Sequence, residues 1–233
     1  MITWDDATIM KLRFTASEIA AILCGEFSRG EIKGEEDFSS ALTREMRRAL
    51  NNMRLEPEYS HGYSPFDSAG PTFKVHATRT TNGFVQSEEN LSGADILIGF
   101  SVPIAGEEVD KTALIQAKLF REEGAFSNFP RKTSEKRRLV RQCIRMRRIS
   151  PEHSYVFVYS SIGIQFYPAA DVIQAYPTGI DFLDGLTFDE FITRLFTCTV
   201  GDHQYQTVHR EDFRDELLRL GIKHAFTVEV LPT

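Results

Sequence analysis

Cysteine is scarce in this sequence. The three cysteines among its 233 residues, Cys24, Cys143 and Cys198, lie far apart and form no CxxC pair. This spacing argues against both a disulfide framework and a structural zinc site. We therefore expect a chain that stays reduced, as proteins of the cytoplasm do.

Long apolar runs are also missing. No stretch approaches the roughly 20 apolar residues that a membrane span needs. The first residues, MITWDDATIMKLRF, lack the apolar core of a signal peptide. We expect a soluble cytoplasmic protein with no membrane partner.

Several catalytic signatures are absent. There is no P-loop, GxSxG or dinucleotide fingerprint, and the six histidines form no HxH or HExxH pattern. The formal net charge of -6 does not indicate a nucleic-acid binder either. Any surface that contacts phosphates would have to be a local one.

Alternating helix and strand patterns are present, and they predict an α/β fold built around one mixed sheet. The helix at 36–53 carries apolar residues at helical spacing. A hairpin of two apolar strands follows, then a basic helix and another apolar strand. The predicted elements are helices at 15–27, 36–53, 134–149, 187–196 and 211–220 and strands at 73–81, 94–104, 112–120, 155–160 and 162–167, the last two forming a hairpin. A terminal apolar run covers 225–231. We divide the chain into an N-terminal helical extension (1–35), a core (36–170) and a C-terminal α/β extension packed on the core (171–233).

Polar side chains interrupt the central hairpin. Asp95 ends the segment Ser92-Gly-Ala-Asp95, where the first strand begins, and Gln116 and Lys118 lie within the apolar second strand. Residues two apart on a strand point to the same face. A buried lysine is costly unless a carboxylate, metal or phosphate compensates it. The alternative is a turn aspartate and a lysine whose stem covers apolar surface while its ammonium reaches water.

This SGAD…QAK pattern resembles the PD-(D/E)XK nuclease superfamily, in particular its Mrr-like and Holliday-junction-resolvase-like branches, in which the second acidic position is often Gln. It also resembles uncharacterised bacterial proteins, several near defence loci. The resemblance covers roughly residues 36–165. It implies a restriction-endonuclease-like mixed central β-sheet flanked by helices, and a magnesium-dependent endodeoxyribonuclease of anti-phage defence or restriction.

The resemblance also implies roles for the three residues. Asp95 and Gln116 would bind Mg²⁺, for which Mn²⁺ can substitute, through a carboxylate and an amide oxygen. Lys118 would orient or help deprotonate the attacking water and stabilise charge on the phosphate. The metal would act as a Lewis acid and activate water.

A second carboxylate is needed to hold Mg²⁺ well. We expect Glu45 to supply it, because Glu45 falls within the apolar stripe of its helix. In the families resembled here, a helix before the sheet supplies such a glutamate. The alternative is that Glu45 pairs with Arg44 or Arg48. Glu89, just before SGAD, is the competing candidate unless it is a solvated loop acid.

The helix after the QAK strand is strongly basic. Residues 131–148 contain nine of the 27 lysines and arginines and a single acid, Glu135. Such a stripe is typical of a surface that follows phosphates. A solvated helix face paired with acids, or a protein interface, is the alternative. The nucleic-acid-binding residues that we predict are Arg137, Arg138, Arg141, Gln142 and Arg145.

Gln142 is a separate case, because it lies within or beside the apolar face of the basic helix. Related nucleases often place a polar residue of this helix in the site, whereas an ordinary boundary glutamine is the alternative. The function that we expect first is cleavage of DNA. The rivals are a catalytically silent module that binds nucleic acid or a partner protein through the basic helix, and a subunit of a homo-oligomer or larger defence complex.

Overall fold

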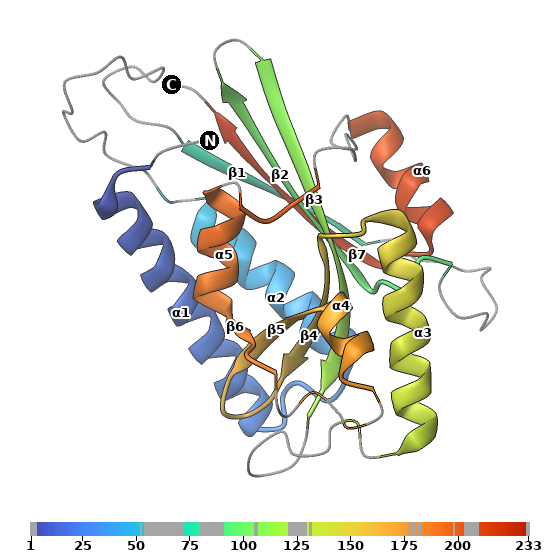
Figure 1. Cartoon of the computed structure of the whole chain (residues 1–233). Coiled ribbons are helices and arrows are strands. Elements are labelled where there is room, and N and C mark those ends of the chain that lie inside the picture. Colours follow the sequence, from blue (N-terminus) through green and yellow to red (C-terminus); the bar gives the residue numbers. More distant parts are fainter. Residues whose placement is uncertain are drawn as a thin grey trace.

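A mixed β-sheet with helices on both faces forms the part of the chain that the structure describes (Figure 1). This computed structural model describes residues 4–51, 53, 72–79, 91–104, 107–120, 130, 132–176, 178, 180, 183–197, 199–202 and 210–231. Its helices are α1 (Asp6–Ser28), α2 (Glu35–Leu50), α3 (Thr133–Ile149), α4 (Ala169–Gln174), α5 (Phe188–Phe196) and α6 (Arg210–Leu220). Its strands are β1 (Thr72–Arg79), β2 (Ile96–Ile104), β3 (Glu107–Leu119), β4 (Ser154–Tyr159), β5 (Ile164–Pro168), β6 (Leu186–Thr187) and β7 (His224–Leu231).

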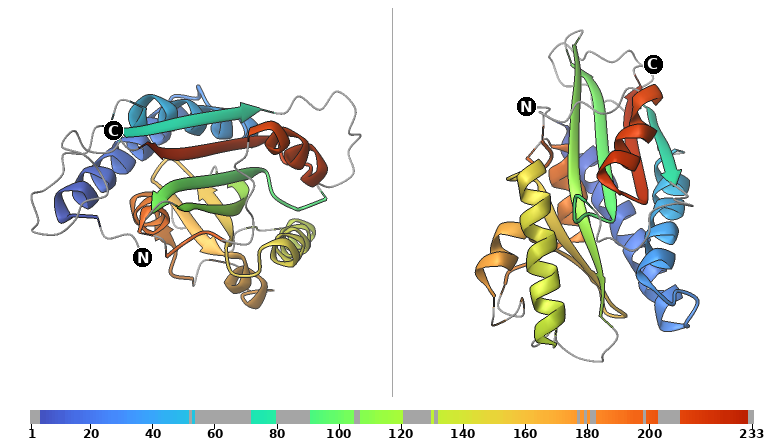
Figure 2. Two further views of the ribbon diagram at one scale, coloured as in Figure 1. Left: turned by 90° about the horizontal axis from the view of Figure 1, so that it is seen from above. Right: turned by 90° about the vertical axis from the view of Figure 1, so that its right-hand side faces the viewer.

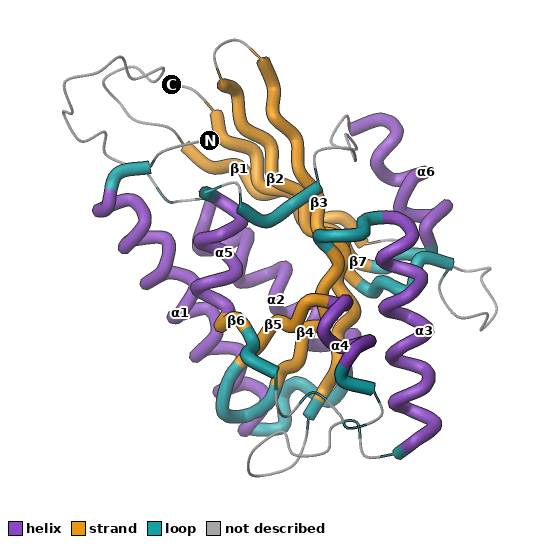
Figure 3. Tube along the Cα trace, in the orientation of Figure 1, coloured by secondary structure: helices purple, strands orange, loops and turns teal. Residues whose placement is uncertain are grey.

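The strands lie in the order β1-β7-β2-β3-β4-β5-β6. The β2–β3 and β4–β5 pairs are antiparallel hairpins, as the sequence predicts, and β4 runs parallel to β3 after the α3 crossover. The α/β class with a mixed sheet is thus confirmed. Figure 3 shows the strands as a central layer between the helices.

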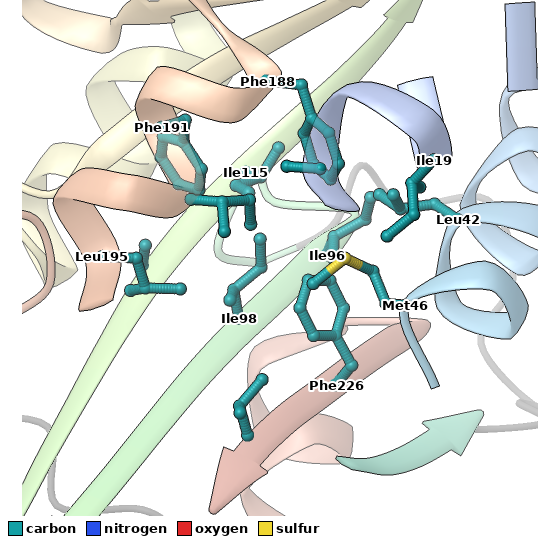
Figure 4. Close-up of a cluster of buried hydrophobic side chains, with 14 of the residues drawn as sticks. Ile19, Leu42, Met46, Ile96, Ile98, Ile115, Phe188, Phe191, Leu195 and Phe226 are labelled. Carbon is teal, nitrogen blue, oxygen red and sulfur yellow. The ribbon is translucent and has the colours of Figure 1, made fainter. Parts of the chain in front are cut away.

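The two sheet faces bury different helices. One apolar cluster joins the sheet to α1, α2 and α5, and includes Leu12, Phe38 and Phe191. Figure 4 shows part of this cluster, with side chains from the helices and the strands gathered together. The second cluster joins the opposite face to α3, α4 and α6 (Figure 2). Alternation of side chains along β3 therefore decides which helices each residue faces.

The C-terminal strand differs from the expected extension. We expected 171–233 to pack on the core, but β7 lies inside the sheet, parallel to β2 and antiparallel to β1. Its residues Ala225, Phe226 and Val228 are fully buried, which explains its apolar sequence. Strands buried on both faces are continuously apolar, and the terminal apolar run at 225–231 is such a strand.

The first helix is longer than predicted. It begins at Asp6 rather than near Thr15, because Asp5 caps it by accepting hydrogen bonds from the backbone N–H and hydroxyl of Thr8, at 2.5 and 3.1 Å. An aspartate at this position satisfies an N–H group that the helix leaves without a partner. None of the helices in the described ranges is both long and apolar enough to cross a membrane.

Candidate metal and nucleic-acid site

The SGAD segment forms a tight turn that fixes Asp95 at the start of β2. Gly93 has a φ of 76°, and a Cβ atom there would lie 2.5 Å from the backbone oxygen of Gln142 on α3. Only glycine combines that conformation with so close an approach. The backbone of Asp95 donates to Ile115 O at 2.8 Å and accepts from His224 N at 3.2 Å. Both neighbouring strands, β3 and β7, therefore hold the residue in place.

Asp95 and Gln116 meet across the β2–β3 hairpin. The register pairs Ile96 with Ile115, which places Asp95 opposite Gln116. Gln116 Nε2 donates a hydrogen bond to Asp95 Oδ2, and also to its neighbour's backbone oxygen, Ala117 O, at 3.1 Å. Gln116 is buried, and its Oε1 has no hydrogen-bond partner among the described residues. A buried amide oxygen without a hydrogen-bond partner lowers the stability of the fold unless a ligand satisfies it.

Strand β3 extends beyond the start of β2, and two carboxylates occupy the strand edge that this leaves. The N–H of Ala117 donates to Asp95 Oδ2 at 3.1 Å. The N–H of Leu119 donates to Glu35 Oε1 at 3.4 Å. Backbone donors at a sheet edge need such partners where the neighbouring strand ends. This edge brings Glu35, the first residue of α2, to the site.

Lys118 completes the group. Its ammonium lies 3.4 Å from Glu35 Oε2, and its side chain is 18% exposed. Lys118 follows Gln116 by two residues on β3, so the two side chains leave the strand on the same face, as the sequence predicts. Leu114, two residues earlier on that face, belongs to the apolar cluster that packs on α3. We call Asp95, Gln116, Lys118 and Glu35 the strand-end site.

The electrostatics of the strand-end site centre on Asp95. Burial raises the pKa of Asp95 to about 6, against the opposing effect of Lys118. The Glu35 carboxylate raises the pKa further, while the Ala117 N–H and Lys223 lower it. A nearby cation would stabilise the charged form of such a carboxyl group.

Glu45 does not lie where we expected. Its oxygens accept hydrogen bonds from Arg44 Nε and Arg48 Nε, both at 2.8 Å. Burial acts to raise the pKa of Glu45, but the two guanidinium groups outweigh it and the pKa is lowered. Glu45 is ten positions beyond Glu35 on α2, about 15 Å along the helix axis. The two arginines neutralise the carboxylate, which explains how Glu45 can lie on the apolar stripe of α2.

Glu35 is the residue that sequence reasoning missed. The sequence predicts a helix that starts at residue 36, but α2 begins one residue earlier with three consecutive acids, Glu35, Glu36 and Asp37. Such acids are typical of a helix N-terminus and mark where α2 begins. This run of acids can be recognised in the sequence, but the position of the helix terminus beside β3 cannot. Glu89 lies outside the described residues.

Helix α3 packs against the turn that carries Asp95. Gln142 is buried on α3 and touches the SGAD turn through its backbone. Its side-chain Oε1 has no hydrogen-bond partner within the described ranges. The neighbouring Cys143 is fully buried, which raises the pKa of the thiol to about 12, opposed by Lys118. Gln142 therefore lies on the buried side of α3 and not at an exposed boundary.

The basic residues of α3 point away from the sheet. Arg137, Arg138 and Arg141 are exposed, and Arg145 is half-buried. Arg137 Nε donates to the hydroxyl of Tyr176 at 3.4 Å. Figure 2 shows α3 at the periphery of the molecule. The helix therefore presents cations on its outer side and Gln142 on its inner side.

The donor set suits a hard divalent cation only in part. Asp95 and Glu35 offer carboxylate oxygens, and Gln116 offers an amide oxygen that no described residue satisfies. Oxygen ligands of these kinds are those that Mg²⁺ and Ca²⁺ prefer. Among the described residues, no three His, Cys, Asp or Glu side chains gather closely enough to hold a metal ion. A metal here would depend on the amide oxygen.

Comparison with known proteins adds no relative. No protein-family model, no curated protein and no solved structure matches the chain.

Proposed function

We propose that the protein is a metal-dependent nuclease that hydrolyses phosphodiester bonds of DNA, in anti-phage defence or restriction. The observation that carries the proposal is the meeting of Asp95, Gln116 and Lys118 at one strand end. Opposite faces for Asp95 and Lys118 would have ruled the proposal out. The resemblance of SGAD…QAK to PD-(D/E)XK nucleases supports the same chemistry, as does the order of helix, strand, hairpin, helix and strand.

Each residue of the strand-end site has a role in this proposal. Asp95, Gln116 and Glu35 would hold Mg²⁺, or Mn²⁺ in its place, through oxygen atoms. When bound, the metal supplies Lewis acidity and lowers the pKa of a bound water. Lys118 supplies an ammonium group that would stabilise negative charge on the scissile phosphate. Its ion pair with Glu35 holds the ammonium near that position.

The test is cleavage of a plasmid in the presence of Mg²⁺ or Mn²⁺. We expect Asp95→Asn, Lys118→Ala and Glu35→Gln each to lower the cleavage rate by at least about 100-fold, the scale for removal of one preorganised charged group. Glu45→Gln should keep the rate within about threefold, because Glu45 pairs with arginines instead. The Glu35 and Glu45 variants are matched, since both remove one carboxylate from α2.

Equal cleavage by the wild type and all variants would assign the activity to a contaminant. A reduced rate with Glu45→Gln but not with Glu35→Gln would refute the strand-end site.

The rival function is a catalytically silent module that binds nucleic acid through α3. One contact favours this rival. Gln116 Nε2 donates a hydrogen bond to Asp95 Oδ2, so an oxygen that would bind the metal already has a partner. Tight binding of DNA without cleavage in either metal would support that rival.

A further inference from the structure

Helix α1 is apolar on two opposite sides. Its inner side buries Leu12, Ile19 and Leu23 against the rest of the protein. Its outer side leaves Met10 and Phe14 at 64% and 65% exposure. A surface helix normally carries polar residues opposite its buried side, and a helix that is apolar all round is normally covered all round. Neither side of α1 belongs to the strand-end site.

The outer residues of α1 follow a seven-residue repeat. Alternating steps of three and four residues join them into one stripe on a helix that lies at the outer edge of the molecule (Figures 1 and 2). Such spacing is typical of a seam between two packed helices. All members are exposed: Ala7, Met10, Phe14, Ser17 and Ala21. We call them the α1 stripe.

We propose that the α1 stripe is the contact surface of a homodimer in which two copies of α1 pack antiparallel. After Ala7, the large residues of the stripe, Met10 and Phe14, precede the small ones, Ser17 and Ala21. An antiparallel pair places Met10 against Ala21 of the second copy and Phe14 against Ser17. Large against small fills such an interface evenly. A parallel pair would place Phe14 against Phe14 and leave a gap between the serines.

The charges beside the stripe fit a second copy of the same helix. Lys11 and Glu18 are seven residues apart, so they occupy the same flank of the stripe. In the antiparallel pair, Lys11 of each copy faces Glu18 of the other, and the contact occurs twice. Complementary charges at these flanking positions set partner choice and orientation. The same surface thus supplies both halves of the interface, as a two-fold dimer requires.

The test is the oligomeric state of the whole chain by sedimentation velocity between about 1 and 100 μM, a range in which moderate interfaces dissociate. We expect a dimer that Phe14→Glu dissociates, raising the dissociation constant by more than about 100-fold, because both copies lose the central aromatic residue. Ile162→Glu is the matched control. Ile162 is 68% exposed but lies between β4 and β5, so its variant should stay dimeric.

Charge reversal tests the orientation. Lys11→Glu alone should weaken the dimer, and Lys11→Glu combined with Glu18→Lys should restore it. In a parallel pair the double variant would instead place the introduced glutamate beside Asp6 of the second copy, so no restoration would follow. A wild-type chain that is monomeric throughout, or a dimer that Phe14→Glu leaves intact, would overturn the proposal. Circular dichroism of each variant confirms that the fold is kept.

Discussion

At the scale of single residues, the strand-end site depends on an aspartate whose charge is unfavourable in the folded protein. Asp95 has a pKa of about 6 because burial disfavours the carboxylate, although Lys118 and the Ala117 N–H oppose this effect. The pKa of an aspartate in an unfolded chain is about 3.9. The folded protein therefore loses stability as the pH rises from about 4 to about 6, because in this range the folded state must give up a proton that it binds more tightly.

Asp95→Asn should remove this destabilisation. At pH 8 we expect the variant to be more stable than the wild type by about 3 kcal/mol, since the shift is about two units and each unit of pKa shift corresponds to about 1.4 kcal/mol. Near pH 3.5 both side chains are neutral and the difference should vanish. Urea unfolding at the two pH values measures it. Equal stability at pH 8 would show that the carboxylate is not penalised. If the nuclease proposal holds, the same substitution stabilises the fold and abolishes cleavage.

At the scale of elements, the contact between the SGAD turn and α3 joins the strand-end site to that helix. Gly93 lets the turn touch the backbone of Gln142, whose side chain is buried. Lys118 on β3 is close enough to influence the pKa of Cys143, which follows Gln142 on α3. The turn, β3 and α3 thus form one packed unit.

Gly93→Ala should destabilise the protein by about 2–4 kcal/mol, because the added methyl group meets backbone atoms and the φ is positive. Gly163→Ala is the matched control, since a Cβ atom at Gly163 would have no described atom within 4 Å. Denaturant unfolding of both variants measures the difference. Similar stabilities for the two would mean that α3 can move away from the turn at little cost.

The elements also show what the sequence could predict. The β2–β3 hairpin and α3 follow local patterns of apolar residues, and the match to D…QxK requires only that hairpin. The role of Glu35 could not be predicted, because it depends on where the first turn of α2 meets the end of β3. The pairing of Glu45 with Arg44 and Arg48 could not be predicted for a related reason, because a helical wheel shows the apolar side of a helix but not which arginines pair at its edge.

At the scale of the whole molecule, the charge distribution is uneven. The chain has a net charge of -6, yet α3 exposes several arginines on its outer side. An acidic protein with a local cationic helix can bind phosphates there while its remaining surface repels them. Because α3 contacts the turn that carries Asp95, phosphates bound along α3 would lie near the strand-end site.

The proposed function implies that Arg138→Ala with Arg141→Ala weakens DNA binding about equally for all sequences. The slope of log affinity against log salt concentration should fall in magnitude by roughly one for each phosphate that the protein no longer neutralises. Arg29→Ala is a suitable control, because Arg29 follows α1 and pairs with Glu31. Fluorescence anisotropy at several salt concentrations gives both quantities. An unchanged salt slope would assign the arginines of α3 to another partner.

The position of β7 has a consequence for the time at which the strand-end site takes its final form. His224 pairs with Ile96 and supports the backbone of Asp95, although more than a hundred residues separate them in the chain. Contacts between such distant residues form slowly. During synthesis the hairpin leaves the ribosome with one edge unpaired, and that edge is covered only when β7 arrives. A growing chain therefore lacks the support that β7 gives to the backbone of Asp95, and the strand-end site takes its final geometry only when the sheet is filled.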